Sequence, residues 1–104
     1  MAEEERKACI ALADEIEDFT RRLKYRLARP PRLSEAELAG VEVLLSSMME
    51  DLSRICGCPA FSSLAKEVRE ITEKYSRGRH GEAFIKAYKL AGAVMGERYK
   101  CDLY

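Results

Sequence analysis

The stretch ARPPRLSEAE, residues 28–37, decides the fold because it ends one helix and begins the next. Proline lacks a backbone N–H and its ring clashes with the preceding helical turn, so Pro30 and Pro31 stop a helix here. Ser34 and Glu37 match a capping box, in which each side chain accepts a hydrogen bond from the backbone N–H of the other residue. The chain is therefore predicted to reverse direction between two helices at this point.

Two further breaks lie downstream, at CGCP, residues 56–59, and at SRGRHG, residues 76–81. Gly57 permits a left-handed turn, and Pro59 suits the first position of a new helix. Between the breaks, apolar residues recur three and four positions apart, as on one face of a helix. Short connections make neighbouring helices antiparallel. We therefore predict an all-α protein of one domain, residues 1–104, folded as an antiparallel up-down-up-down four-helix bundle.

The same spacing predicts which side chains form the core. In the first three helices these are Cys9, Leu12, Ile16, Phe19, Leu23, Leu38, Val41, Leu45, Met48, Leu52, Ile55, Phe61, Leu64, Val68, Ile71 and Tyr75. The fourth helix is apolar on more than one face, and Gly92 and Gly96 suggest close packing inside the bundle. The surplus apolar surface, together with Val43, Leu44 and Met49 on the second helix, predicts a homodimer through the fourth helix.

Composition narrows the class of protein. The chain has 18 basic and 18 acidic residues, so no overall charge draws it to nucleic acid or to a membrane. No apolar run approaches the roughly 20 residues that span a bilayer, and the start MAEEE does not resemble a signal peptide, so we expect a cytoplasmic protein without membrane contact. Asn, Gln and Trp are absent, a composition associated with hyperthermophiles, whose intracellular proteins can carry disulfides.

The cysteines are expected to meet at one end of the bundle. Cys9 and Cys58 lie early in the first and third helices, whereas Cys56 and Cys101 lie late in the second and fourth. They admit three interpretations: buried apolar thiols, disulfides in which Cys56 and Cys58 each reach Cys9 or Cys101, or a metal or iron–sulfur site. The spacing matches neither a paired Cys-x-x-Cys zinc site nor a ferredoxin, so close or oxidised thiols are preferred to metal.

Arginines are predicted to gather at the opposite end. The candidate anion or nucleic-acid site consists of Arg26, Arg29, Arg32, Arg77, Arg79 and His80. Gly78 and Gly81 are expected to leave backbone amides free at the start of the fourth helix, where the dipole favours phosphate. The alternative is that these arginines are solvated helix caps.

No catalytic motif accompanies these groups: there is no P-loop, no Glu-x-x-His di-iron motif, and no nucleophile with a matching histidine. Residues 75–88 resemble the helix turn of a tetratricopeptide hairpin, which favours a protein-binding module. We therefore expect a non-enzymatic adaptor without a cofactor, whose partner is another protein or its own copy. A more specific form of this hypothesis is that the arginines bind RNA, DNA or a phosphorylated ligand. The alternative hypothesis is a thiol-dependent protein that binds a metal or acts in redox chemistry.

Overall fold

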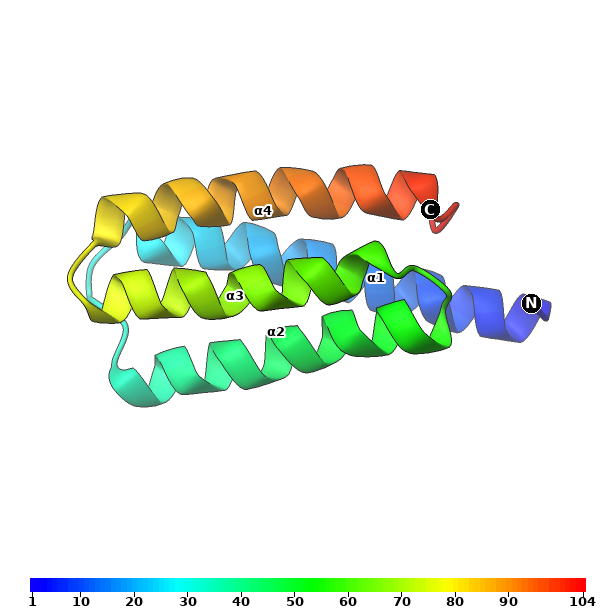
Figure 1. The fold of residues 1–104 in the computed structure, drawn as a ribbon, viewed down its shortest axis with the longest axis horizontal. Helices are drawn as coiled ribbons and strands as arrows, with labels where there is room; N and C mark the ends of the chain where they lie inside the picture. The colour runs from blue at the N-terminus through cyan, green and yellow to red at the C-terminus, as the bar shows by residue number, and fades with distance from the viewer.

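The all-α prediction is confirmed by the computed structural model, which describes residues 1–104. Four helices follow one another: α1 (Glu3–Leu27), α2 (Glu35–Ile55), α3 (Ala60–Ser76) and α4 (His80–Lys100). They run alternately in opposite directions along a bundle that measures 45 × 22 × 20 Å (Figure 1). No helix has both the length and the apolar character needed to cross a membrane.

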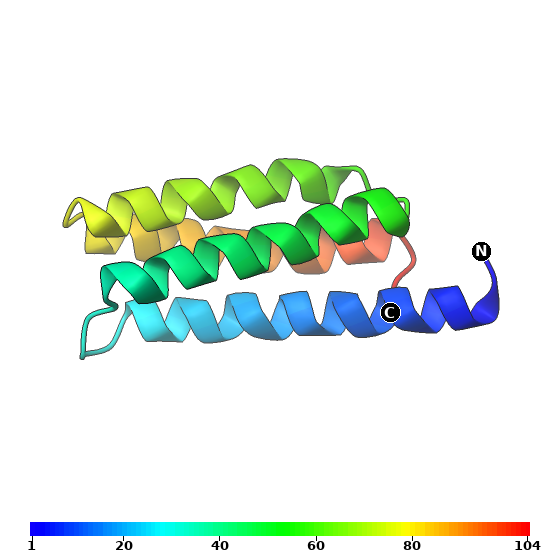
Figure 2. The same cartoon turned by 90° about the horizontal axis from the view of Figure 1, so that it is seen from below.

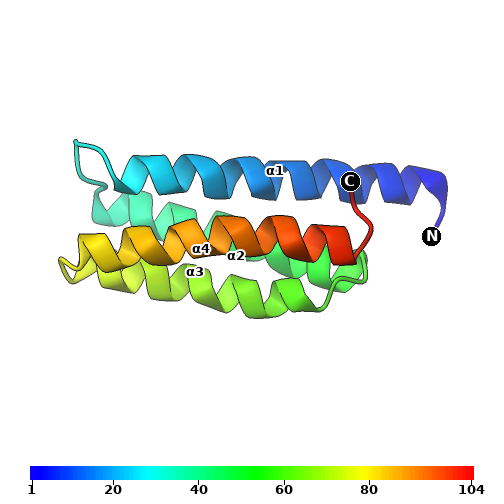
Figure 3. The same ribbon diagram turned by 90° about the horizontal axis from the view of Figure 1, so that it is seen from above.

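Each helix packs against its neighbours in the chain, and α4 closes the bundle against α1. As a result α2 and α4 lie diagonally opposite each other, as do α1 and α3. The first turns of α1 extend beyond the ends of the other helices (Figures 2 and 3). The packing is uneven, because α2 lies closest to α3 and α1 lies closest to α4, whereas α1 and α2 approach each other least.

The first two breaks have the predicted chemistry. The Ser34 hydroxyl accepts a hydrogen bond from the Glu37 N–H at 3.1 Å, and the Glu37 carboxylate accepts one from the Ser34 N–H at 3.0 Å. Gly57 and Gly78 have φ values of 69° and 84°, in the left-handed region that glycine adopts without strain. The capping box and the Gly57 turn are therefore confirmed.

The core differs from the prediction where α1 faces α2. In α2 the buried apolar residues are Leu38, Leu45, Met49 and Leu52. Val41 and Met48, which were predicted to be core, are only half-buried, and Ile55 is 67% exposed. Met49, which was assigned to the surface, is fully buried. Because α2 turns its apolar face toward α3, the side that faces α1 stays partly open.

The same correction applies to α1. Leu12 and Phe19 were predicted to be core but are half-buried, whereas Ala13 and Thr20 are buried. The shift follows from the close packing of α1 on α4, which turns Phe19 toward α2. The two helices therefore leave apolar side chains along their shared seam.

Arg98 is a buried charge that the sequence did not reveal. Its side chain is 7% exposed, and it donates to Asp14 at 2.8 Å and to Glu17 at 3.3 Å, both on α1. Its Nε also donates to the backbone carbonyl of Leu103 at 2.7 Å. Arg98 thus joins α4 to α1 and holds the C-terminal tail, where Leu103 is buried.

Candidate functional site

All four cysteines lie at one end of the bundle, as predicted, and form two disulfides. Cys9 pairs with Cys56, and Cys58 pairs with Cys101, with Cα–Cα distances of 5.9 and 5.8 Å. The expectation that Cys9 or Cys101 takes part in a bridge is confirmed. No thiolate remains to bind a metal, and no other group of side chains has the composition of a metal site.

The disulfides fasten helices rather than line a cavity. Cys9 is in α1, and Cys56 is the residue that follows α2, so their bridge joins these two helices at one end. Cys58 lies in the α2–α3 turn and is fully buried, and its bridge reaches Cys101 after α4. Burial restricts exchange with outside thiols, which supports a structural role for both bonds.

The arginines lie at the other end, but they do not form one site. Arg29, Arg32 and His80 line a hollow of about 270 Å³ that contains no carboxylate. Arg77 and Arg79 line a separate hollow of about 210 Å³, together with Glu70 and Glu73.

Arg26 belongs to neither hollow. It donates hydrogen bonds to the carbonyls of Arg29 and Pro31 and forms an ion pair with Glu37 at 3.8 Å. Its guanidinium therefore holds the first loop in place.

The third break is less open to an anion than the sequence suggested. The N–H groups of Gly78 and Arg79 donate to the carbonyls of Tyr75 and Lys74, and so close the end of α3. Arg79 also forms an ion pair with Glu82 at 3.7 Å. Gly78 itself therefore frees no amide, because it serves the C-terminal cap of the preceding helix, whereas the accessibility of the amides at the start of α4, next to Gly81, stays a prediction.

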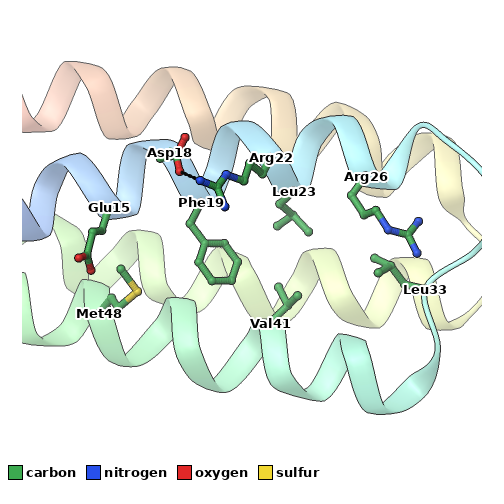
Figure 4. A pocket seen from close by; sticks show the side chains of 9 residues that line it. All are labelled: Glu15, Asp18, Phe19, Arg22, Leu23, Arg26, Leu33, Val41 and Met48. Carbon is green, nitrogen blue, oxygen red and sulfur yellow. Dashed lines mark ion pairs between the residues drawn. The ribbon is translucent and has the colours of Figure 1, made fainter.

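A groove of about 600 Å³ lies between α1 and α2 (Figure 4). We call it the α1/α2 groove. Its apolar residues are Phe19 and Leu23 from α1, Leu33 from the first loop, and Val41 and Met48 from α2. Phe19 points from α1 toward α2, between Met48 and Val41. These side chains form a continuous apolar floor.

The rim of the groove on α1 is charged and ordered along the helix. Glu15 and Asp18 come first and Arg22 and Arg26 follow one to two turns later, nearer the first loop. Asp18 and Arg22 form an exposed ion pair at 2.5 Å. Near the same end of the groove, hydrogen bonds from Ser34 and the charge of Arg26 lower the pKa of the Glu37 carboxyl.

The surface of α2 beside the groove carries exposed apolar residues. Leu44 lies one helical turn from both Val41 and Met48, and it is 59% exposed. Ile55 continues the same side of α2, two turns beyond Met48. The groove thus has an apolar floor and a charged rim on α1.

A second apolar surface lies on the outward face of α4, far from the groove. We call it the outer stripe, and it consists of Ile85, Tyr88, Gly92, Met95, Gly96 and Tyr99. The expectation that Gly92 and Gly96 pack inside the bundle is wrong, because both are exposed and a Cβ on either would meet no atom within 4 Å. The close internal packing of α4 uses Ala83 and Ala87 instead.

The sequence alone did not reveal the groove, because its apolar residues resemble core residues and its charged residues resemble helix surface. Phe19, Val41 and Met48 lie on the predicted core stripes, and no sequence motif distinguishes the charges at Glu15 and Arg22. The width of the apolar stripe on α2 was a signal from which the groove could have been predicted. Met48 and Met49 are both apolar, although only Met49 is fully buried.

Comparison of the chain with protein-family models, with curated proteins and with solved structures finds no match in any of the three.

Proposed function

We propose that this chain is a non-catalytic adaptor that binds an amphipathic helix of a partner protein in the α1/α2 groove. The observation that supports the proposal is the groove itself, with its five apolar side chains and its volume of about 600 Å³. An apolar groove between two helices is a common receptor for the apolar face of a third helix.

The charged rim defines the partner. The rim from Glu15 to Arg26 runs about 16 Å at 1.5 Å per residue, so it accommodates about three turns of helix. Acidic groups at one end and basic groups at the other favour a helix with basic residues beside Glu15 and acidic residues beside Arg26. Acidic residues are most stable in the first turn of a helix and basic residues in the last, so this partner runs antiparallel to α1.

Both ends of the groove are fastened, which supports binding to a preformed site. The Cys9–Cys56 bridge joins α1 to α2 at one end. At the other end the capping box holds the start of α2, and Arg26 holds the loop that carries Leu33. A groove that does not have to form on binding requires less ordering of side chains and backbone.

The test uses a designed helical peptide of about 12 residues, the length of the rim at 1.5 Å per residue. It carries apolar residues three and four positions apart, Glu in its first turn and Lys in its last. A control peptide has the same composition with the charges reversed. We expect the first peptide to bind more tightly, with amide and methyl NMR shifts at Phe19, Val41 and Met48.

A matched pair of variants makes the test specific. Met48→Glu places a charge in the groove, whereas Ser47→Glu places the same charge on the adjacent exposed position. Met48→Glu should abolish peptide binding and Ser47→Glu should leave it unchanged, provided both variants keep the wild-type helical circular dichroism. Equal binding by the two variants, or shift changes confined to another surface, would show that the groove is not the site.

Phosphate recognition at the arginine end is a second candidate. The supporting observation is that Arg29, Arg32 and His80 share a hollow without any carboxylate, and that neither arginine is part of an ion pair. Arginine forms bidentate hydrogen bonds with phosphate oxygens, so this hollow suits a nucleic-acid backbone or a phosphorylated ligand. Arg77 and Arg79 are poorer candidates because Glu70 and Glu73 share their hollow.

The two arginine pairs can be compared directly. With a single-stranded RNA oligonucleotide as probe, the logarithm of the binding constant should fall linearly with the logarithm of salt concentration. Arg29→Ala/Arg32→Ala should reduce the slope by up to about two units, whereas Arg77→Ala/Arg79→Ala should change it less. Binding that is insensitive to both pairs would remove nucleic acid from consideration.

We also propose a cellular compartment for this protein. Disulfides persist in oxidising compartments and inside hyperthermophiles. The absence of Asn and Gln supports the second setting and therefore a cytoplasmic protein of a hyperthermophile.

A further inference from the structure

The outer stripe of α4 is an apolar surface that the bundle leaves uncovered. Its four large side chains are between 50% and 63% exposed. Ile85, Tyr88, Gly92, Met95 and Tyr99 lie alternately three and four positions apart, which is the spacing of a seam between two packed helices. The residues by which α4 enters the core lie on the opposite side of the helix. The outer stripe therefore lies outside the core and about half of its apolar side-chain surface stays exposed.

Packing within one chain does not require glycine at either position of the stripe. A Cβ on Gly92 or Gly96 would enter open space, so alanine would fit either position. Glycine inside a helix is less stable than alanine, because it loses more conformational freedom on folding. Exposed glycines do, however, allow the backbone of a second helix to approach closely.

We propose that a second copy of this chain covers the outer stripe, in an antiparallel two-fold pair of α4 helices that cross near Gly92. In such a pair, a residue before Gly92 faces the residue equally far after Gly92 in the other copy. Tyr88, four positions before, then faces Gly96, four positions after, so that the ring fills the space above the glycine. Ile85 faces Tyr99 by the same rule, which places an apolar side chain against an aromatic one.

The charges beside the stripe favour the antiparallel arrangement. Glu82 and Lys100 are exposed, and the helical repeat places them on the same flank of α4, near opposite ends. Within each chain Glu82 pairs with Lys74 and Arg79, and Lys100 pairs with Glu97, all at the surface. The antiparallel pair additionally brings Glu82 of each copy near Lys100 of the other. A parallel pair would instead place Lys100 beside Lys100 and Tyr88 against Tyr88, with Gly96 facing Gly96 across a gap.

The exposed area is sufficient for a weak dimer. Tyr25 extends the surface, since it shares a hollow of about 250 Å³ with Tyr88 and Met95 between α1 and α4. Lys24 lies between the two tyrosines, with its Nζ 5.0 Å from the Tyr25 ring and 4.9 Å from the Tyr88 ring. The exposed parts of the large side chains amount to roughly 600 Å² per copy. If all of this area were covered, two copies would bury about 1,200 Å², at the lower limit of stable interfaces.

Sedimentation analysis of two glycine variants tests the interface. Gly96→Leu fills the space that the Tyr88 ring would occupy, whereas Gly40→Leu changes an equally open glycine on α2. We expect the wild type and Gly40→Leu to be dimeric at about 0.5 mM, and Gly96→Leu to dimerise at least 100-fold more weakly. Because a Cβ at either position would meet no other atom of the chain within 4 Å, both variants should fold. A wild type that stays monomeric, or equal dimerisation by both variants, would overturn the proposal.

Cross-linking tests the orientation. Glu82 and Lys100 of one chain are 18 residues apart on a continuous helix, about 27 Å. A zero-length carbodiimide cross-link between them can therefore form only between two copies. We expect this cross-link in the dimer band and its loss in Lys100→Arg. A dimer joined only through residues near the same end of α4 would contradict the antiparallel geometry.

The α4 interface and the α1/α2 groove can be tested separately. Gly96→Leu should leave peptide binding to the groove unchanged, and Met48→Glu should leave the sedimentation of the dimer unchanged. A negative result for the groove would therefore not contradict the α4 interface, and a negative result for the α4 interface would not contradict the groove.

Discussion

The backbone N–H of Leu33 donates a hydrogen bond to the Tyr75 hydroxyl at 3.0 Å, which joins positions 42 residues apart in the chain. Leu33 lines the α1/α2 groove, whereas Tyr75 is buried at the end of α3 and its ring lies 4.3 Å from the ring of His80. Tyr75 therefore links the loop that closes the groove to the break that precedes α4.

Replacing Tyr75 by phenylalanine should release this loop without changing the core. The ring stays in place, but the Leu33 N–H loses its acceptor, so the free energy of unfolding should fall by about 1 kcal/mol. Hydrogen exchange at the Leu33 amide should accelerate more than exchange at other loop amides. Unchanged Leu33 exchange would show that the hydroxyl does not hold the loop.

Arg98→Met should destabilise the chain through loss of the α1–α4 contact. The methionine covers similar apolar surface but cannot donate to Asp14, Glu17 or the Leu103 carbonyl. We expect a loss of about 2 kcal/mol in urea denaturation. Lys100→Met is the control, because the exposed Lys100–Glu97 pair should contribute less than about 0.5 kcal/mol. Equal effects of the two changes would contradict a structural role for Arg98.

The two disulfides should have similar effects on stability but different effects on the groove. Their sequence separations, 47 and 43 residues, correspond to about 4 kcal/mol each in the chain-entropy account. Cys9→Ser/Cys56→Ser should also weaken peptide binding, because only that bridge joins α1 to α2. Cys58→Ser/Cys101→Ser should not. Mass mapping of the native protein should find both pairs and no free thiol.

The ion pair between Glu70 on α3 and Lys86 on α4 should make stability depend on pH. The Lys86 ammonium lies 2.8 Å from the Glu70 carboxylate, and its hydrogen bond and charge lower the pKa of Glu70. A pKa below its unfolded value gives stability that is present above about pH 4.5 and is lost as pH falls through the folded value. Glu70→Gln should therefore be less stable than wild type at pH 7, and this difference should disappear in strong acid.

The control for this prediction is Glu67→Gln. Glu67 also faces Lys86, but at 3.7 Å. Its removal should change the pH profile less than Glu70→Gln does. A Glu70→Gln variant whose stability difference is the same at pH 7 and at pH 2.5 would show that the carboxylate charge does not contribute.

The helices, their direction and the gathering of the cysteines at one end were predictable, because local signals such as the Ser34–Glu37 capping box determine them. The groove was not predictable in this way. Whether Met48 or Met49 is buried depends on how far α2 rotates toward α3, which is a property of packing between helices. For the same reason the periodicity could not show that Gly92 and Gly96 face outward.

The arginine end shows that sequence also fails to predict the contacts of individual charged side chains. Topology brought Arg29, Arg77 and His80 to one end, but the ion pair of Arg79 with Glu82 and the hydrogen bonds of Arg26 depend on individual rotamers. Sequence spacing can place a charge at one end of a bundle. It cannot show which neighbouring carboxylate or carbonyl already binds the charged group.

The diagonal placement of α2 and α4 determines the valency of the proposed assembly. Since α2 forms one wall of the groove and makes no contact with α4, a pair joined through α4 leaves the groove of each copy uncovered. Such a pair presents two receptors on one rigid body. A partner with two matching helices could engage both, and its avidity would exceed the affinity of a single groove by roughly 10²–10⁴ where its linker spans the distance.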